Sequence, residues 1–293
     1  MKMLINGSTK IIGIIGDPIE HSKSPILHNY ISDSKNINAV YVPFRVAPNS
    51  LSDAISGLRG LNVIGFNVTV PHKNKVIEYL DGVSEEARLM GAVNTVKNVN
   101  GELWGYNTDG DGFLRSFKEE TGHSFSGKSV AIIGAGGAAR AIAVKAALEG
   151  AGKMVILNRT IDKAKELSDY INDNISDCCS FVGTEHNDVK NAIMDCQIII
   201  NTTSVGMYPS TDKCPIEANS FLNDRHIVYD IIYNPVKTEL LKVAEKKGSI
   251  AVNGLGMLFY QGINAYEKWM DIEFSENEIE QFYTRFKKAV MEI

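Results

Sequence analysis

The chain has 293 residues, of which 44% are hydrophobic and 22% charged, a balance that excludes a disordered or fibrous protein. At about 150 residues per domain, this length predicts two ordinary domains. The formal net charge is −5 and no run of basic residues interrupts the sequence, so we expect no nucleic-acid partner. The N-terminal stretch lacks the apolar core of a signal peptide, and no segment is apolar enough to cross a bilayer. These features predict a cytoplasmic protein with no membrane partner.

The cysteines and histidines do not form a metal-binding or disulfide pattern. Cys178, Cys179, Cys196 and Cys214 contain no CxxC pair, and we interpret them as reduced thiols. The adjacent Cys178 and Cys179 fit either a redox switch or the start of a short strand, and we favour the strand. No histidine pair has the HExxH spacing, so we expect no metal.

In the first third of the chain, short β-branched runs alternate with segments of helical periodicity. Ser24-Pro25 opens a predicted helix, since proline is favoured in the first helical turn. Leu51, Ala54, Ile55 and Leu58 form one apolar stripe of a second helix. We predict strands at 10–17, 39–46 and 63–70, a helix from 71 to 80 and another near 84–90.

The segments 92–97 and 102–107 flank Asn100-Gly101, a pair that supplies the positive φ angles of a tight hairpin. Beyond a helix at 111–120, the strand and helix alternation starts again. We predict strands at 129–134, 154–159, 178–183, 197–203, 226–232 and 249–253, then helices at 257–270 and 276–291. This order predicts an α/β fold of two domains, an N-terminal domain with a mostly parallel sheet and a Rossmann dinucleotide-binding domain.

A glycine-rich turn follows the strand at 129–134 at once and leads into an alanine-rich helix. The run Gly134, Ala135, Gly136, Gly137, Ala138 and Ala139 has the GxGxxA form in its strand–turn–helix setting. Gly134 permits the tight turn, Gly136 lets the backbone approach a pyrophosphate, and Ala139 allows close packing of helix on strand. We therefore predict a dinucleotide site, the alternative being a glycine-rich turn that binds nothing.

The next strand ends in Asn158-Arg159-Thr160, where an NAD site would carry Asp or Glu for the ribose hydroxyls. A guanidinium offers donors to a phosphate and no acceptor to a ribose hydroxyl. Arg159, with Thr160 and Lys163, therefore predicts NADP, and it disfavours a nucleoside such as S-adenosylmethionine. The alternative is that Arg159 is a solvated surface cation.

Polar residues of the first half fall where strands end, which is where ligands of open α/β sheets bind. Their neutral donors and acceptors suit a small polyhydroxylated molecule, and Lys73 is a candidate for the ionisable group of a ketone reduction. Each has a structural alternative: Ser24 as a helix cap, Asn94 as a turn residue and Asp109 as a cap of the following helix. We interpret His72 as a surface or packing residue. The candidates are Ser22, Ser24, Asn67, Thr69, Lys73, Asn94 and Asp109.

Several separate blocks of the sequence resemble the shikimate dehydrogenase family in order and spacing. They are SKSP at 22–25 with His28-Asn29, NVTVPHK at 67–73, GAVNT at 91–95, GYNTDG at 105–110, GAGGAAR at 134–140, NRT at 158–160, NTTSVGM at 201–207, and GLGM at 254–257 with Gln261. The resemblance spans nearly the whole chain. It implies NADPH-dependent, reversible reduction of 3-dehydroshikimate to shikimate in aromatic amino-acid biosynthesis.

The resemblance also implies roles for individual residues. Ser22 and Ser24 would hold the substrate carboxylate with Tyr233 nearby, and Lys73 and Asp109 would be the catalytic pair. Asn67, Thr69, Asn94, Asp109 and Gln261 would bind the substrate's hydroxyls and the reacting oxygen. The cofactor would contact Gly134, Ala135, Gly136, Gly137, Ala138, Asn158, Arg159, Thr160, Lys163, Ile231, Gly254 and Met257.

The final helices would return to the first domain, giving a substrate domain of residues 1–110 and 257–293 and an NADP domain of residues 111–256. Lys163 stands where relatives often have a second arginine and Ile231 where many have methionine. The competing interpretations are a quinate/shikimate dehydrogenase with broader substrate or cofactor use and a non-catalytic NADP-binding regulator. The expected partner is a small-molecule substrate, and the chain is predicted to be a monomer or homodimer.

Overall fold

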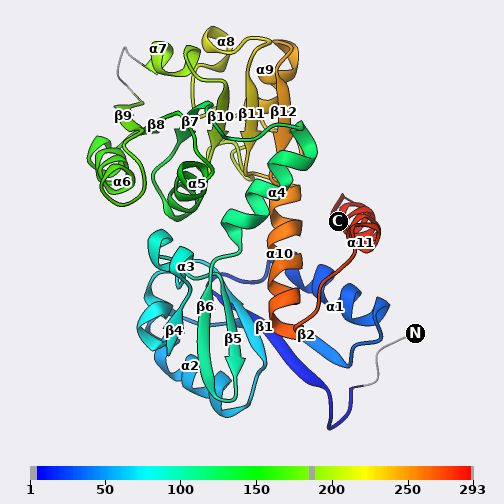
Figure 1. The fold of residues 1–293 in the computed structure, drawn as a ribbon. Helices are drawn as coiled ribbons and strands as arrows, with labels where there is room; N and C mark the ends of the chain where they lie inside the picture. The colour runs from blue at the N-terminus through cyan, green and yellow to red at the C-terminus, as the bar shows by residue number, and fades with distance from the viewer. Residues whose placement is uncertain (1–4, 185–188, 292–293) are drawn as a thin grey trace. The chain divides into compact units, whose positions relative to one another are not determined.

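The computed structural model describes residues 5–184 and 189–291, which divide into two compact units. Unit 1 comprises Met1–Thr108 and Gln261–Ile293, and unit 2 comprises Asp109–Tyr260. The chain passes from one unit to the other at the first residue of helix α4 (Asp109–Thr121) and within helix α10 (Leu255–Met270). Figure 1 shows each unit with its own sheet.

Unit 1 is built on a six-stranded sheet in the order β2-β1-β3-β5-β6-β4. β1 pairs in parallel with β2 and β3, β5 is antiparallel to both β3 and β6, and β4 is parallel to β6. The parallel half places the ends of β1 and β3 at one edge. The strands are β1 (Lys10–Gly16), β2 (Ala39–Arg45), β3 (Gly65–Val68), β4 (Gly82–Val83), β5 (Thr95–Val99) and β6 (Glu102–Tyr106).

The hairpin of β5 and β6 confirms the prediction from the Asn-Gly pair. Val99 faces Glu102 across the ladder, and the turn residues Asn100 and Gly101 have φ angles of 54° and 93°. Two successive positive φ angles match the twist of the strands, and Asn and Gly are the residues that adopt them most easily.

The two faces of the first sheet bury different side chains because successive strand residues point in opposite directions. Phe66 and Val68 of β3 pack in one core with Leu51 and Ile55 of α2. Asn67, between them, therefore points to the opposite face. The helical segments are α1 (Ser24–Ser34), η1 (Pro48–Ser50), α2 (Leu51–Gly60), η2 (Lys75–Tyr79), α3 (Glu85–Met90), the end of α10 and α11 (Glu276–Met291).

Two predictions for the segment around β3 were wrong in extent. The strand expected at 63–70 covers only Gly65–Val68, and the helix expected from 71 is a 3-10 helix that begins at Lys75. Polar contacts hold the chain between them in a turn: His72 N–H donates to Thr69 O, and the Asn74 amide donates to Gly91 O. The strand β4 was not predicted.

Unit 2 is built on a second six-stranded sheet, all parallel, in the order β12-β11-β10-β7-β8-β9. The chain order reverses between β7 and β10, the kind of switch point where doubly wound sheets bind dinucleotides. The predicted Rossmann domain is thereby confirmed. The strands are β7 (Ser129–Ile133), β8 (Lys153–Asn158), β9 (Cys179–Gly183), β10 (Ile198–Asn201), β11 (Ile227–Asp230) and β12 (Ile250–Asn253).

Helices cover both faces of this sheet. Ala131 and Ile133 of β7 point into a core with Ile193 of α7 and Leu240 of α9. The remaining helices are α5 (Gly137–Leu148), α6 (Ile161–Asn174) and α8 (Ala218–Phe221), with bounds Val189–Met194 for α7 and Glu239–Lys246 for α9. Over residues 5–184 and 189–291, no helix combines the length and apolar character needed to traverse a bilayer.

Candidate functional site

The glycine-rich turn of unit 2 joins β7 to α5 at the switch point of the sheet. Gly134 has a φ of +114°, and a Cβ there would lie 2.5 Å from Thr202 Oγ1, so both conformation and space require glycine. Gly136 caps α5 without a side-chain hydrogen bond, and nothing lies within 4 Å of a Cβ built at Gly136 or Gly137. No neighbouring side chain therefore crowds these two glycines, and a helix that starts on such a turn without a side-chain cap is suited to bind a diphosphate.

The end of the neighbouring strand β8 carries the predicted phosphate-binding residues. The Asn158 amide donates to Thr160 O at 2.8 Å and closes the turn before α6. Arg159, Thr160 and Lys163 are exposed. An exposed guanidinium and ammonium beside a hydroxyl can bind a phosphate monoester.

A buried carboxylate joins the loops that follow β10 and β11. Asp230 accepts hydrogen bonds from the Asn201 amide at 2.9 Å, from Ile232 N–H at 3.1 Å and from the Thr238 hydroxyl at 2.7 Å. Asn201 Oδ1 in turn accepts from the N–H and the hydroxyl of Thr203. Burial raises the pKa of Asp230 to about 6, and these donors act against the shift. The network fixes two loops at the edge of the sheet that carries the glycine turn.

Ile231 and Gly254, two predicted cofactor residues, lie in close contact at this edge. A Cβ at Gly254 would lie 1.9 Å from Ile231 O, so only glycine lets the backbone after β12 pass so close to the backbone after β11. Ile231 N–H donates to Asn201 O. Met257 follows in the first turn of α10.

In unit 1, the two predicted serines lie where β1 leads into α1. Ser24 is the first residue of α1 and Lys23 occupies the cap position without a side-chain cap bond, so the alternative that Ser24 caps the helix is wrong. Ser22 Oγ instead accepts from Ser24 N–H at 3.3 Å.

Asn67 and Asn94 form the centre of a buried polar network in unit 1. The Asn67 amide nitrogen donates to Asn94 O at 3.0 Å and to Thr95 Oγ1 at 3.1 Å. Asn94 Oδ1 accepts from Thr108 N–H at 2.7 Å, and Asn94 Nδ2 donates to Gln261 Oε1 at 3.3 Å. Three predicted substrate residues therefore come together. Asn94 cross-links three segments rather than shaping a turn.

Thr69 and Lys73 follow β3 at the same edge. Thr69 N–H donates to Ile15 O of β1, and Val93 N–H donates to Lys73 O at 2.8 Å, which ties the Lys73 backbone to the segment before Asn94. His72 is buried, and its Nε2 lies 2.7 Å from Val46 O. It is a packing residue, one of the two readings offered by the sequence.

The predicted catalytic and substrate residues are distributed over both units. Lys73, the serines, the asparagines and Gln261 belong to unit 1, whereas Asp109 begins α4 in unit 2. Tyr233 follows β11 in unit 2, and burial raises the pKa of its hydroxyl.

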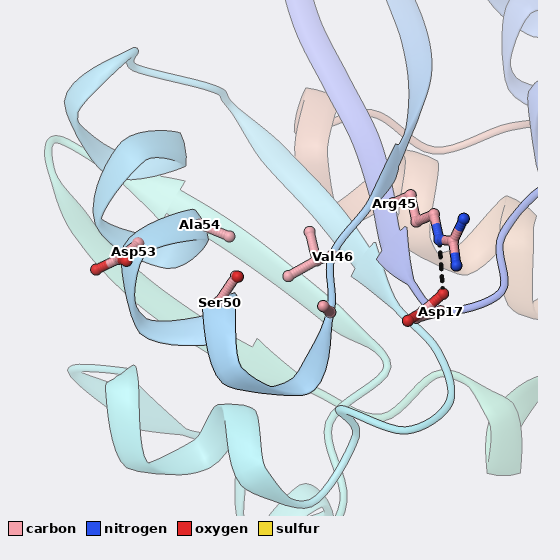
Figure 2. Close-up of a pocket in the computed structure, with 7 residues that line it drawn as sticks. Asp17, Arg45, Val46, Ser50, Asp53 and Ala54 are labelled. Carbon is pink, nitrogen blue, oxygen red and sulfur yellow. Dashed lines mark hydrogen bonds and ion pairs between the residues drawn. The ribbon is translucent and has the colours of Figure 1, made fainter.

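A surface pocket in unit 1 is lined by none of the predicted residues. Figure 2 shows Arg45, at the end of β2, turned toward Asp17, with Arg45 Nε 2.8 Å from Asp17 Oδ1. Because Arg45 and Asp17 neutralise each other in this ion pair, they offer little net charge to a ligand, and the pocket is a weak candidate for a charged ligand. Its lining is Asp17, Arg45, Val46, Ala47, Ser50, Asp53 and Ala54. Within the described part of the chain, no cluster of His, Cys, Asp or Glu is arranged to hold a metal ion.

Residues that support the site were missed by the sequence reasoning. Tyr41, Thr95 and Thr108 brace Asn67 and Asn94, and Asn201 and Asp230 brace the cofactor loops. Asn201 and Asp230 each end an apolar strand, so the rule that polar residues at strand ends mark a site applies to them too. Tyr41 lies within a strand and gave no such signal.

The comparisons with known proteins agree on one family. The model described as the shikimate dehydrogenase substrate binding domain matches residues 14–96, and the model described as shikimate / quinate 5-dehydrogenase matches residues 116–231. A shikimate dehydrogenase (NADP(+)) from Methanopyrus kandleri is 42% identical over 265 residues, covering 90% of this chain and 91% of the relative.

Solved structures extend the similarity to three dimensions. A crystal structure of a shikimate dehydrogenase in complex with NADP+ has a TM-score of 0.90 and 42% identity, covering 98% of this chain and 97% of that one. A shikimate 5-dehydrogenase from Listeria monocytogenes, in complex with shikimate and NAD, has a TM-score of 0.89 and 38% identity, covering 94% and 97% of the two chains.

Proposed function

Because the chain belongs to the shikimate dehydrogenase family, we propose that it catalyses the reversible, NADPH-dependent reduction of 3-dehydroshikimate to shikimate. The observation that carries this proposal is the similarity to an NADP+ enzyme over 90% of the chain, which takes in residues of both units. The chain would therefore be an oxidoreductase that acts on a CH-OH group.

The residues around the glycine turn fit NADP. The uncapped start of α5 would hold the diphosphate with Gly134, Ala135, Gly136, Gly137 and Ala138. The 2′-phosphate would bind Arg159 and Thr160, with Asn158 shaping the turn and Lys163 adding positive charge. Ile231, Gly254 and Met257 would lie against the nicotinamide. Residues 111–256 would form the NADP domain.

Residues 1–110 and 257–293 would form the substrate domain. Ser22 and Ser24 would donate to the substrate carboxylate, with Tyr233 nearby. The network around Asn67 and Asn94 would orient the ring, because its members already fix one another's amide and hydroxyl groups. The substrate hydroxyls would thus be bound by Asn67, Thr69, Asn94, Asp109 and Gln261.

The proposed catalytic pair is Lys73 and Asp109. When bound, NADPH supplies the hydride that reduces the ketone carbon. Negative charge then develops on the carbonyl oxygen, and an ammonium group within hydrogen-bond reach stabilises that charge and can provide the proton. Lys73 would do this, and the carboxylate of Asp109 would accept a hydrogen bond from the hydroxyl that forms at the reacting carbon.

A broader quinate/shikimate dehydrogenase is the second candidate. It is favoured by the family model, whose description names quinate as well as shikimate, and by the Listeria relative, which was crystallised with NAD. The exposed Arg159 at the end of β8 argues for NADP in this chain. A non-catalytic NADP-binding regulator is the remaining alternative. A cytoplasmic location and a monomeric or homodimeric state remain predictions.

The test is a spectrophotometric assay of the purified chain. With shikimate and NADP+, we expect absorbance to rise at the NADPH band, and with quinate or NAD+ we expect much slower turnover. Equal rates with quinate would support the second candidate. Absence of turnover, together with NADP+ binding in a titration, would support the regulator.

A further inference from the structure

Tyr41 lies in β2 of unit 1, with both its backbone and its ring held in place. Its N–H donates to Asn29 Oδ1 at 2.8 Å, and its carbonyl accepts from the Asn29 amide at 3.0 Å. Its ring stacks on His28, with centroids 4.3 Å apart and planes at 25°. The side chain is 2% exposed. These contacts therefore fix the position of the Tyr41 hydroxyl.

The Tyr41 hydroxyl contacts the side chain of Asn67, and the neighbours of Asn67 determine the orientation of its amide. One neighbour is the backbone carbonyl of Asn94, which can only accept, so Asn67 must turn its nitrogen toward it. Asn67 Oδ1 then faces Tyr41, and the Tyr41 hydroxyl donates to it at 2.7 Å.

The same contacts decide what Asn67 can offer a ligand. One amide hydrogen is donated to Asn94 O and the other to Thr95 Oγ1. Asn67 therefore meets a ligand only through its oxygen, as an acceptor of a hydroxyl proton. Were the amide to rotate, a nitrogen would face the ligand and an oxygen would face the Asn94 carbonyl.

The Tyr41 hydroxyl keeps its proton in this site. Burial is the largest effect on its pKa and holds that pKa well above the ordinary value, while the neighbouring Ser24 lowers it by a smaller amount. The phenol is therefore the donor in its hydrogen bond with Asn67 Oδ1.

We propose that Tyr41 is a positioning residue for the substrate, which acts by holding the Asn67 amide so that it accepts from a substrate hydroxyl. This inference rests on the proposed function for the identity of the substrate, but the contact of Tyr41 with Asn67 does not depend on it. It predicts that the loss of this one buried hydroxyl weakens substrate recognition.

The test compares Tyr41→Phe with a matched control in the same cluster, Tyr266→Phe. Tyr266 is also fully buried, and its hydroxyl lies 2.8 Å from Ser32 Oγ. Ser32 donates its own proton to His28 O, so Tyr266 is likewise a donor. Both variants keep the aromatic ring and lose one buried hydrogen bond, but only Tyr41→Phe removes the donor from Asn67 Oδ1.

We expect Tyr41→Phe to lower kcat/KM for shikimate about 10- to 100-fold, mostly through KM, because a buried acceptor loses its donor. NADP affinity should stay unchanged, and Tyr266→Phe should remain near the parent. In an Asn67→Ala background, Tyr41→Phe should have no further effect, since its target is gone. Parental kcat/KM in Tyr41→Phe, an equal loss in Tyr266→Phe, or full additivity with Asn67→Ala would each overturn the proposal.

A second readout does not need catalysis. In NMR spectra, the side-chain amide signals of Asn67, assigned by their loss in Asn67→Ala, should shift in Tyr41→Phe and not in Tyr266→Phe. If the parent fails to oxidise shikimate, the proposed function is wrong while these signals still test the contact. Unchanged Asn67 signals would show that Tyr41 does not position Asn67. A Tyr41→Phe chain that fails to fold while Tyr266→Phe folds would overturn the proposal in favour of a structural role for the hydroxyl.

Discussion

Replacing Asp230 by asparagine should change how the stability of unit 2 depends on pH. Asp230 is fully buried at the end of β11, and burial raises its pKa from 3.8 to about 6. The folded chain therefore takes up the proton at a higher pH than the unfolded chain does. Protonation of Asp230 stabilises the fold, so its contribution is complete below pH 3.8 and is lost as the pH rises through 6.

The magnitude follows from the size of the shift. A change of about 2 pKa units corresponds to about 3 kcal/mol, of which about 2 kcal/mol falls between pH 4 and pH 6. Asparagine at position 230 carries no charge but keeps an oxygen for Asn201 and Ile232, and its nitrogen can donate to the Thr238 hydroxyl. Relative to the parent, Asp230→Asn should thus gain about 2 kcal/mol of unfolding free energy over this range.

Amide hydrogen exchange in β10 and β11 measures the unfolding of unit 2, provided the rates are corrected for intrinsic exchange at each pH. Trp104 and Trp269 both lie in unit 1, so their fluorescence reports the unit that should not respond. Burial lowers the pKa of His28 to about 3, which acts in the opposite direction, but His28 is common to both chains and lies in unit 1. If the difference in the unfolding free energy of unit 2 between variant and parent stays constant from pH 4 to pH 6, the reasoning is refuted.

Three further substitutions test the candidate site. Lys73→Ala should lower kcat by at least about 100-fold with NADP affinity unchanged, whereas Lys75→Ala, at a neighbouring exposed lysine, should keep parental turnover. Near-parental turnover in Lys73→Ala would contradict the catalytic role of Lys73. Arg159→Ala should weaken NADP binding about 10- to 100-fold in a fluorescence titration and leave NAD binding unaltered, whereas the control Lys165→Ala should leave the binding of both nucleotides unaltered. Equal effects of Arg159→Ala on both nucleotides would argue against a 2′-phosphate contact. Gly254→Ala should destabilise unit 2 by about 1–3 kcal/mol because the new Cβ would collide with Ile231 O, whereas Gly57→Ala, in open space on α2, should not destabilise unit 1. A calorimetric scan in which Gly254→Ala unfolds at the parental temperature would show that the loops tolerate the methyl group.

Most elements were predictable because their pattern is local. The strand β7, the turn at Gly134 and the helix α5 follow one another without interruption, so hydrophobic runs and glycine spacing identify all three. The strand β4 has only two residues, which is too short for any periodicity. The segment after β3 looked helical by composition, but His72 and Asn74 hold it in a turn through contacts with Val46 and Gly91, which are remote in sequence.

The candidate site divides in the same way. Asn67 and Asn94 could be chosen from the sequence because each lies at a strand end in a block typical of the family. The contacts that hold their side chains could not be predicted from the sequence. Asn67 is bonded to Tyr41, 26 residues away, and Asn94 to Gln261, 167 residues away. Long-range contacts of this kind leave no periodic trace in the chain.

The contact between Asn29 and Tyr41 also bears on how copies of this protein can associate. β2 is an edge strand of the first sheet, and an edge with free N–H and C=O groups invites another strand to add to it. Here the Asn29 amide occupies the outward groups of Tyr41, and Pro43 of the same strand has no N–H to donate. β4 at the opposite edge spans only Gly82–Val83. Extension of this sheet is therefore disfavoured at both edges, so a homodimer would form more readily through helices or loops than by adding a strand of one molecule to the sheet of the next.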